Sequence, residues 1–98
     1  MREDVTPELH LAIKRMELNV LDGWLADLIE RRFRTVAELL EWKRTCGLKL
    51  VDEERERYVV SCARSGGKRV AQIVEMIIRL GKETDDGRSL VSDRPDDP

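Results

Sequence analysis

Apolar residues recur along most of this chain at spacings of three and four, and this periodicity limits what the chain can fold into. Four residues near the start share one face of a predicted helix: Leu9, Ile13, Met16 and Val20. No two segments alternate polar and apolar residues as paired β-strands do. The sequence therefore predicts an all-α protein, either a small bundle of four to five helices or an orthogonal helical array.

Residues that favour helix ends divide the periodic stretches into four predicted helices. Thr6 and Pro7 suit the start of the first helix, and Thr35, three residues before Glu38, forms a capping box that predicts the start of the second. Gly23 lies inside the first helix and either bends it or divides it in two. The predicted helices cover residues 7–32, 35–46, 52–64 and 68–81.

Length and charge predict one helical domain followed by a tail. The chain has 98 residues, which is the size of one domain, and we place that domain at residues 7–82 after a flexible N-terminus at 1–6. Residues 83–98 hold six acids, two bases and few large apolar side chains. This segment is predicted to be an acidic, mostly disordered tail.

Histidine and cysteine are too few to indicate a metal site. The chain has one histidine, His10, and two cysteines, Cys46 and Cys62, which are too scattered for a closed zinc site. His10 is interpreted as a boundary residue rather than a general base, and no catalytic motif is present. We therefore predict that the protein is not an enzyme and needs no cofactor.

The N-terminus and the apolar runs indicate where in the cell the protein is located. The first residues, MREDVTPELH, lack the apolar core of a signal peptide, and no apolar run reaches the length of a membrane span. We expect a cytoplasmic protein with reduced thiols and no membrane partner.

The segment SCARSGGKRVAQIVEMIIRLGKE, residues 61–83, places two glycines before two basic residues. It lacks the upstream glycine and the Ser or Thr of a phosphate-binding loop. Ala63, Gly67 and Ile73 follow a spacing that resembles the helix-turn-helix of bacterial repressors, but the helix after the turn is mostly Ile, Val and Met, which cannot read base edges. We interpret the turn as a structural joint in which Gly66 or Gly67 adopts a positive φ.

Part of the same segment, GKRVAQIVEMIIRLGKE, resembles the fifth helix of caspase-recruitment domains in the death-fold superfamily. In those domains a basic start, an apolar helix and a terminal basic residue with glycine occur together. The resemblance covers residues 67–83 and implies a death-fold-like adaptor module as one further alternative.

Binding of another macromolecule is the function that the composition favours. The apolar helical surface exceeds what a body of about eighty residues can hide. The first hypothesis is a non-enzymatic protein–protein interaction or regulatory module that forms a homodimer. Its predicted interface consists of Leu9, Ile13, Met16, Val20, Met76 and Ile78.

Nucleic-acid binding is the alternative hypothesis, because basic residues gather at the ends of predicted helices. The formal net charge of −2 argues neither for nor against an anionic partner. The candidate phosphate contacts are Arg31, Arg32, Arg34, Lys68 and Arg69.

Overall fold

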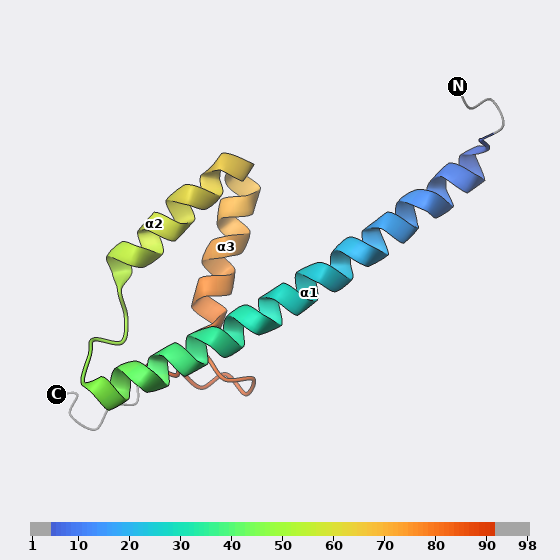
Figure 1. Cartoon of the computed structure of the whole chain (residues 1–98). Helices are drawn as coiled ribbons and strands as arrows, with labels where there is room; N and C mark the ends of the chain where they lie inside the picture. The colour runs from blue at the N-terminus through green and yellow to red at the C-terminus, as the bar shows by residue number, and fades with distance from the viewer. Residues whose placement is uncertain (1–4, 92–98) are drawn as a thin grey trace. The chain divides into compact units, whose positions relative to one another are not determined.

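Three α-helices account for most of residues 5–91, which are the residues that this computed structural model describes (Figure 1). They are α1 (Pro7–Cys46), α2 (Glu53–Ala63) and α3 (Lys68–Leu80), and the short 3-10 helix η1 (Arg64–Gly66) joins α2 to α3. The described residues contain no β-strand, only one isolated bridge between Glu83 and Ser89. The all-α class is confirmed, whereas the predicted count of four to five helices is not.

The count differs because α1 is one helix where the sequence predicted two. It continues through Thr35, so the capping box does not begin a helix, and through Gly23, which does not divide one. A capping box acts only where the backbone leaves the helical conformation before it. Residues 33–35 include neither glycine nor proline, so nothing there favours a break.

The other helix ends lie where the sequence predicts them, and their side chains show why. At the start of α1 the Leu9 amide donates to the Thr6 hydroxyl at 3.0 Å. At the start of α2 the Arg55 amide donates to the Asp52 carboxylate, also at 3.0 Å. Gly67 precedes α3 with a φ of +102°, which confirms the predicted positive φ in this turn.

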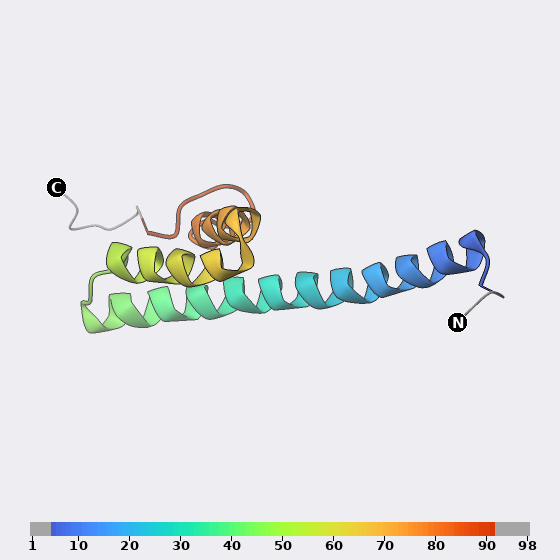
Figure 2. The ribbon, with the colours of Figure 1, turned by 90° about the horizontal axis from the view of Figure 1, so that it is seen from above.

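Contacts divide the chain into two units, Met1–Arg31 and Arg32–Pro98. The first unit contains the N-terminal part of α1. In the second unit η1 turns the chain so that α2 and α3 pack together, both on the same side of the C-terminal part of α1 (Figures 1 and 2). The end of α3 lies close to α1, since a Cβ on Gly81 would be 3.4 Å from the Phe33 ring.

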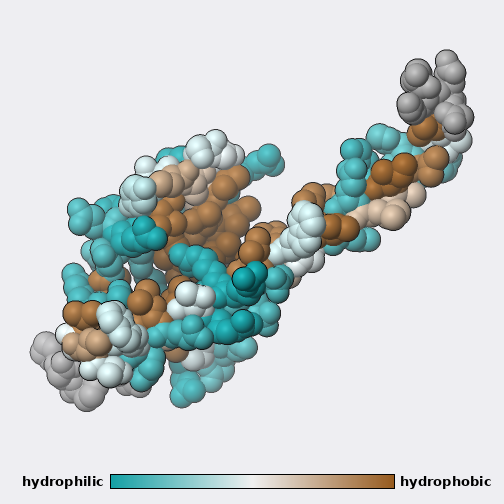
Figure 3. Space-filling view, in the orientation of Figure 1, coloured by the Kyte–Doolittle hydropathy of each residue, from teal (hydrophilic) through white to brown (hydrophobic). Residues whose placement is uncertain are grey.

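Very little apolar surface is buried within the described residues. Leu40, Leu50 and Ala71 are the buried hydrophobic residues, with exposed fractions of 4%, 4% and 3%. Large side chains elsewhere remain open, and Met16 and Trp24 are 66% and 64% exposed. Figure 3 shows apolar surface over α2 and α3 and along the N-terminal part of α1. Surface of this extent marks an interface in soluble proteins.

Substitutions at Gly67 and at Gly23 should have opposite effects on the stability of the fold. Gly67→Val places a β-branched residue at a φ of +102° and should destabilise the fold by about 1–3 kcal/mol. Gly23→Ala adds a Cβ with no atom within 4 Å inside a helix and should stabilise it by about 0.5–1 kcal/mol. Urea unfolding at one fixed protein concentration measures both, and a Gly67→Val protein as stable as the parent would contradict the strain argument.

Candidate functional site

One pocket of the second unit gathers four cationic side chains from around all three helices. Arg32 and Lys43 come from α1, Arg55 comes from α2, and Lys82 follows the end of α3. The pocket has a volume of about 270 Å³, close to the lower end for small-molecule sites. We call it the basic pocket. Its other lining residues are Thr35, Val36, Leu39, Leu40, Leu50, Asp52, Glu56, Val59 and Ile78.

The sequence of α1 explains how one helix supplies two of these cations. Arg32, Val36, Leu39 and Lys43 follow one another at spacings of four, three and four, so they share one face of the helix. A cation thus stands at each end of a short apolar stripe. The two charges are held apart by the helix itself rather than by flexible chain.

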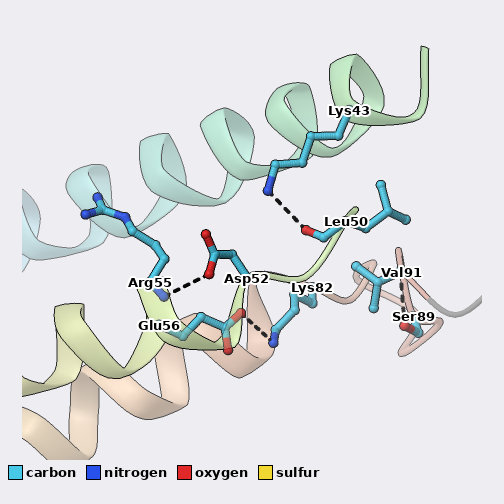
Figure 4. Close-up of polar contacts among 8 residues, drawn as sticks. All are labelled: Lys43, Leu50, Asp52, Arg55, Glu56, Lys82, Ser89 and Val91. Atoms are coloured by element: carbon cyan, nitrogen blue, oxygen red, sulfur yellow. Dashed lines mark hydrogen bonds and ion pairs between the residues drawn. The ribbon is translucent and has the colours of Figure 1, made fainter. Parts of the chain in front are cut away.

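The start of α2 supplies the facing wall. Asp52 caps the helix, and three further residues of the same face line the pocket: Arg55, Glu56 and Val59. Figure 4 shows the Arg55 side chain extending from α2 toward α1. Its guanidinium carbon also lies 5.9 Å from the centre of the Tyr58 ring, within the range of a cation–π contact. The helix cap, Asp52, and the cation that lines the pocket, Arg55, therefore come from the same turn of α2.

Hydrogen bonds fix the two lysines of the basic pocket (Figure 4). The Lys43 ammonium donates to the Leu50 carbonyl at 3.2 Å, which ties α1 to the loop before α2. The Lys82 ammonium donates to the Glu56 carboxylate at 2.8 Å, which ties the end of α3 to α2. The side chains of this pair are only 24% and 31% exposed, so the contact is partly shielded from water.

Charge in the basic pocket is unbalanced. Four cationic side chains face two carboxylates, Asp52 and Glu56, which leaves a formal charge of +2. Within the described residues the guanidinium groups of Arg32 and Arg55 make no ion pair. Guanidinium groups bind carboxylates through two parallel hydrogen bonds. The arrangement is therefore suited to a small ligand that carries two carboxylates.

The resolved pKa shifts belong to groups outside the basic pocket. A hydrogen bond with the Cys62 side chain, and then the charge of that side chain, raises the pKa of Tyr58. A hydrogen bond from the Thr84 hydroxyl, and then one from the Arg88 amide, lowers the pKa of Asp86. All of these side chains lie on α2 or in the turn after α3.

The residues proposed for phosphate binding are not gathered into one site in the second unit. Arg32 lines the basic pocket, but Lys68 and Arg69 begin α3, at the end of that helix away from Lys82. Arg34, also on α1, does not line the pocket. In the first unit Arg31 lies 3.8 Å from Asp27 in an exposed ion pair.

The six predicted interface residues differ in their surroundings. Ile78 is half-buried and lines the basic pocket, so it belongs to the site. The other five are exposed, with fractions between 42% and 66%. They are Leu9, Ile13, Met16, Val20 and Met76.

Sequence reasoning missed most of the polar lining of the basic pocket. Lys43 suits the negative end of α1 and Asp52 suits a cap, so each residue already had a local explanation. The signal that was available is the pair of cations at the two ends of one apolar stripe on α1. Lys43 was noted, but only as part of a basic group that could bind phosphate. The residues missed are Asp52, Arg55, Glu56 and Lys82.

Two kinds of feature are absent from the described residues. No group of three or more His, Cys, Asp or Glu residues in residues 5–91 is placed to hold a metal ion. In the same part of the chain, no helix combines the length and the apolar character that crossing a membrane requires.

Comparison with protein-family models matches residues 14–92, which is most of the chain, to the model described as chorismate mutase type II. No match was found among curated proteins or among solved structures. The matched family is one of enzymes, isomerases of aromatic amino acid biosynthesis.

This match overturns the function predicted from the sequence. The expectation of a non-enzymatic interaction or regulatory module is wrong, and so are the alternatives of a nucleic-acid-binding protein and a death-fold-like adaptor. The physical reason is that the site carries no local motif. Its residues come from separate helices and meet only when these helices pack.

The partly shielded Glu56–Lys82 pair should contribute more to stability than an exposed pair of the same kind. Lys14 and Glu17 form the matched control, at 3.1 Å with side chains 55% and 56% exposed. A double-mutant cycle of Lys82→Met with Glu56→Gln should give a coupling of about 1 kcal/mol, against at most about 0.5 kcal/mol for Lys14→Met with Glu17→Gln. Equal couplings in urea unfolding would contradict the shielding of the pair.

Proposed function

Because the chain belongs to the chorismate mutase type II family, we propose that it catalyses the isomerisation of chorismate in the basic pocket. The observation that carries the proposal is the formal charge of +2 on the lining, with two guanidinium groups that make no ion pair among the described residues. Chorismate carries two carboxylates, so its charge is complementary. The predicted cytoplasmic location is part of the proposal, since Cys46 and Cys62 are both free thiols.

Arg32 and Arg55 are the proposed ligands of the two carboxylates. They project from different helices, so a substrate bound by both is held at two separate points. Fixing both ends of a flexible molecule removes rotational freedom that the reaction would otherwise have to overcome. A rearrangement within one molecule gains most from such positioning, because no second reactant has to be brought in.

The reaction itself needs no nucleophile from the protein. In the isomerisation the bond between the ring and the ether oxygen breaks while a carbon–carbon bond forms within the same molecule. Negative charge develops on the ether oxygen as its bond lengthens, and a fixed N–H donor at that point lowers the barrier. Lys43 and Lys82 are the proposed donors, and Val36, Leu39 and Val59 supply apolar walls that strengthen their effect.

We also propose that the enzyme is a homodimer. Chorismate mutases are often homodimers, which is compatible with this proposal. The face of Leu9, Ile13, Met16 and Val20 is exposed on α1. Leu11, Leu18 and Leu25 follow at spacings of seven and lie on another side of the same helix, also exposed. A helix that is apolar on several sides is normally buried, and a second copy is the partner that could cover it.

Loss of Arg55 should abolish most of the activity. Arg55→Ala removes a proposed carboxylate ligand and is expected to lower kcat/KM for chorismate by about 100-fold or more. Arg57→Ala is the matched control, because Arg57 lies on α2 but does not line the basic pocket. The disappearance of chorismate, followed by absorbance, measures both. A parent protein that does not accelerate the reaction, or an Arg55→Ala protein with full activity, would refute the proposal.

A lysine in the exposed apolar face of α1 should disrupt the dimer. Met16 is 66% exposed in one chain, and Met16→Lys would place a charge where the second copy is proposed to pack. We expect light scattering to give the mass of two chains for the parent and of one chain for Met16→Lys. Lys14→Gln, on the same helix, should remain dimeric. A parent protein that is monomeric at high concentration rules out the dimer.

A further inference from the structure

Lys82 lies beyond the last residue of α3, so the helix does not fix it completely. Its amide donates to the Arg79 carbonyl at 3.2 Å, but its own carbonyl has no partner within α3. The lysine side chain has several rotatable bonds, which makes the position of its ammonium group sensitive to the backbone beneath it. Glu56 holds the ammonium group, but a contact other than those of α3 must hold the backbone of Lys82 beneath it.

The chain after α3 supplies that support by folding back on itself. The Leu90 amide donates to the Lys82 carbonyl at 2.6 Å, and the Thr84 amide donates to the Arg88 carbonyl at 2.7 Å. Gly87, with a φ of +89°, forms the turn between them. We call residues 82–90 the C-terminal hairpin. The hydrogen bond farthest from the turn, between the Leu90 amide and the Lys82 carbonyl, ends on the residue that carries a cation of the basic pocket.

The turn of the C-terminal hairpin is held by its own side chains. The Thr84 hydroxyl donates to the Asp86 carboxylate and accepts from the Arg88 amide at 3.1 Å. The same hydroxyl lowers the pKa of Asp86, as expected for a carboxylate that is hydrogen-bonded in its charged form. The hairpin is therefore an ordered element of the described residues rather than a loose connection.

Arg44 fastens the C-terminal hairpin to α1. Its guanidinium donates to the Leu90 carbonyl and lies 3.5 Å from the Glu41 carboxylate. Leu90 is thus held on both sides, through its carbonyl by α1 and through its amide by Lys82. Arg44 also follows directly on Lys43, which lines the basic pocket. The same turn of α1 therefore carries Lys43 and, through Arg44 and Leu90, is connected to the backbone of Lys82.

We propose that Arg44 is a positioning residue for the reaction, because it closes the C-terminal hairpin on α1 and thereby fixes the Lys82 ammonium in the basic pocket. Arg44 itself does not line that pocket, so the role proposed for it involves no contact with the substrate. The inference rests on the proposed function only for its kinetic consequence. The hairpin contacts that carry it are independent of the substrate.

Kinetics of single and double variants test whether Arg44 acts through Lys82. Arg44→Ala should lower kcat/KM for chorismate by about 3- to 10-fold, the value of one hydrogen bond. In a Lys82→Ala background the same change should have no further effect, because there is no ammonium left to position. Arg44→Lys keeps a donor for the Leu90 carbonyl and should recover part of the loss. An equal loss with and without Lys82, or no loss in the parent, overturns the proposal.

Two more variants separate the hairpin from the charge of Arg44. Gly87→Val strains the turn at a φ of +89° without changing any charge. Like Arg44→Ala, it should lower kcat/KM in the parent and have no further effect on kcat/KM in the Lys82→Ala background. Lys49→Ala removes an exposed cation just after α1 that lies outside both the pocket and the hairpin, and should leave kcat/KM unchanged. Full activity in Gly87→Val would exclude a role for the hairpin.

Nuclear magnetic resonance distinguishes failure of this inference from failure of the proposed function. In Arg44→Ala the Leu90 amide should exchange with solvent faster and the ¹⁵N shift of the Lys82 ammonium should move, while both stay as in the parent for Lys49→Ala. These measurements need no substrate. An inactive parent refutes the proposed function alone, whereas unchanged Leu90 exchange and Lys82 shift refute the positioning role whatever the activity.

Discussion

Burial of apolar surface is the constraint on which this protein depends. Ordering a chain costs free energy that burial must offset, yet the described residues bury only three hydrophobic side chains. Two of the three, Leu40 and Leu50, also line the basic pocket. The small core and the site are therefore built on the same residues, and a second copy that covers α1 would support both at once.

Prediction from sequence succeeded where one side chain decides one backbone conformation. Asp52 caps α2 and Gly67 allows the turn before α3, and both effects act within a few residues. Thr35 failed for the converse reason. Its capping box describes how a helix can begin but supplies nothing to end the helix already running through it, and no glycine or proline precedes it closely. The preference of Thr35 for a helix start therefore did not interrupt α1, which continues through it.

The site was harder to predict because each of its charges also fits a local role. Lys43 suits the end of a helix and Asp52 suits a cap, so neither requires a ligand to explain it. Arg32 was noticed, but as a phosphate contact. Lys82 is held by Glu56 on α2 and by the Leu90 amide of the segment after α3, and the sequence was interpreted as tail from Glu83 onward. The opposing charges of different helices become one site only through packing.

The unequal charge of the basic pocket bears on how quickly a dianion arrives and leaves. The whole chain has a formal charge of −2, whereas the pocket lining has +2, so a dianion meets weak repulsion far from the protein and attraction close to it. Salt screens both fields, the distant one more completely. The association rate constant will therefore change little with ionic strength, and higher salt will act mainly by shortening the time that the ligand stays bound.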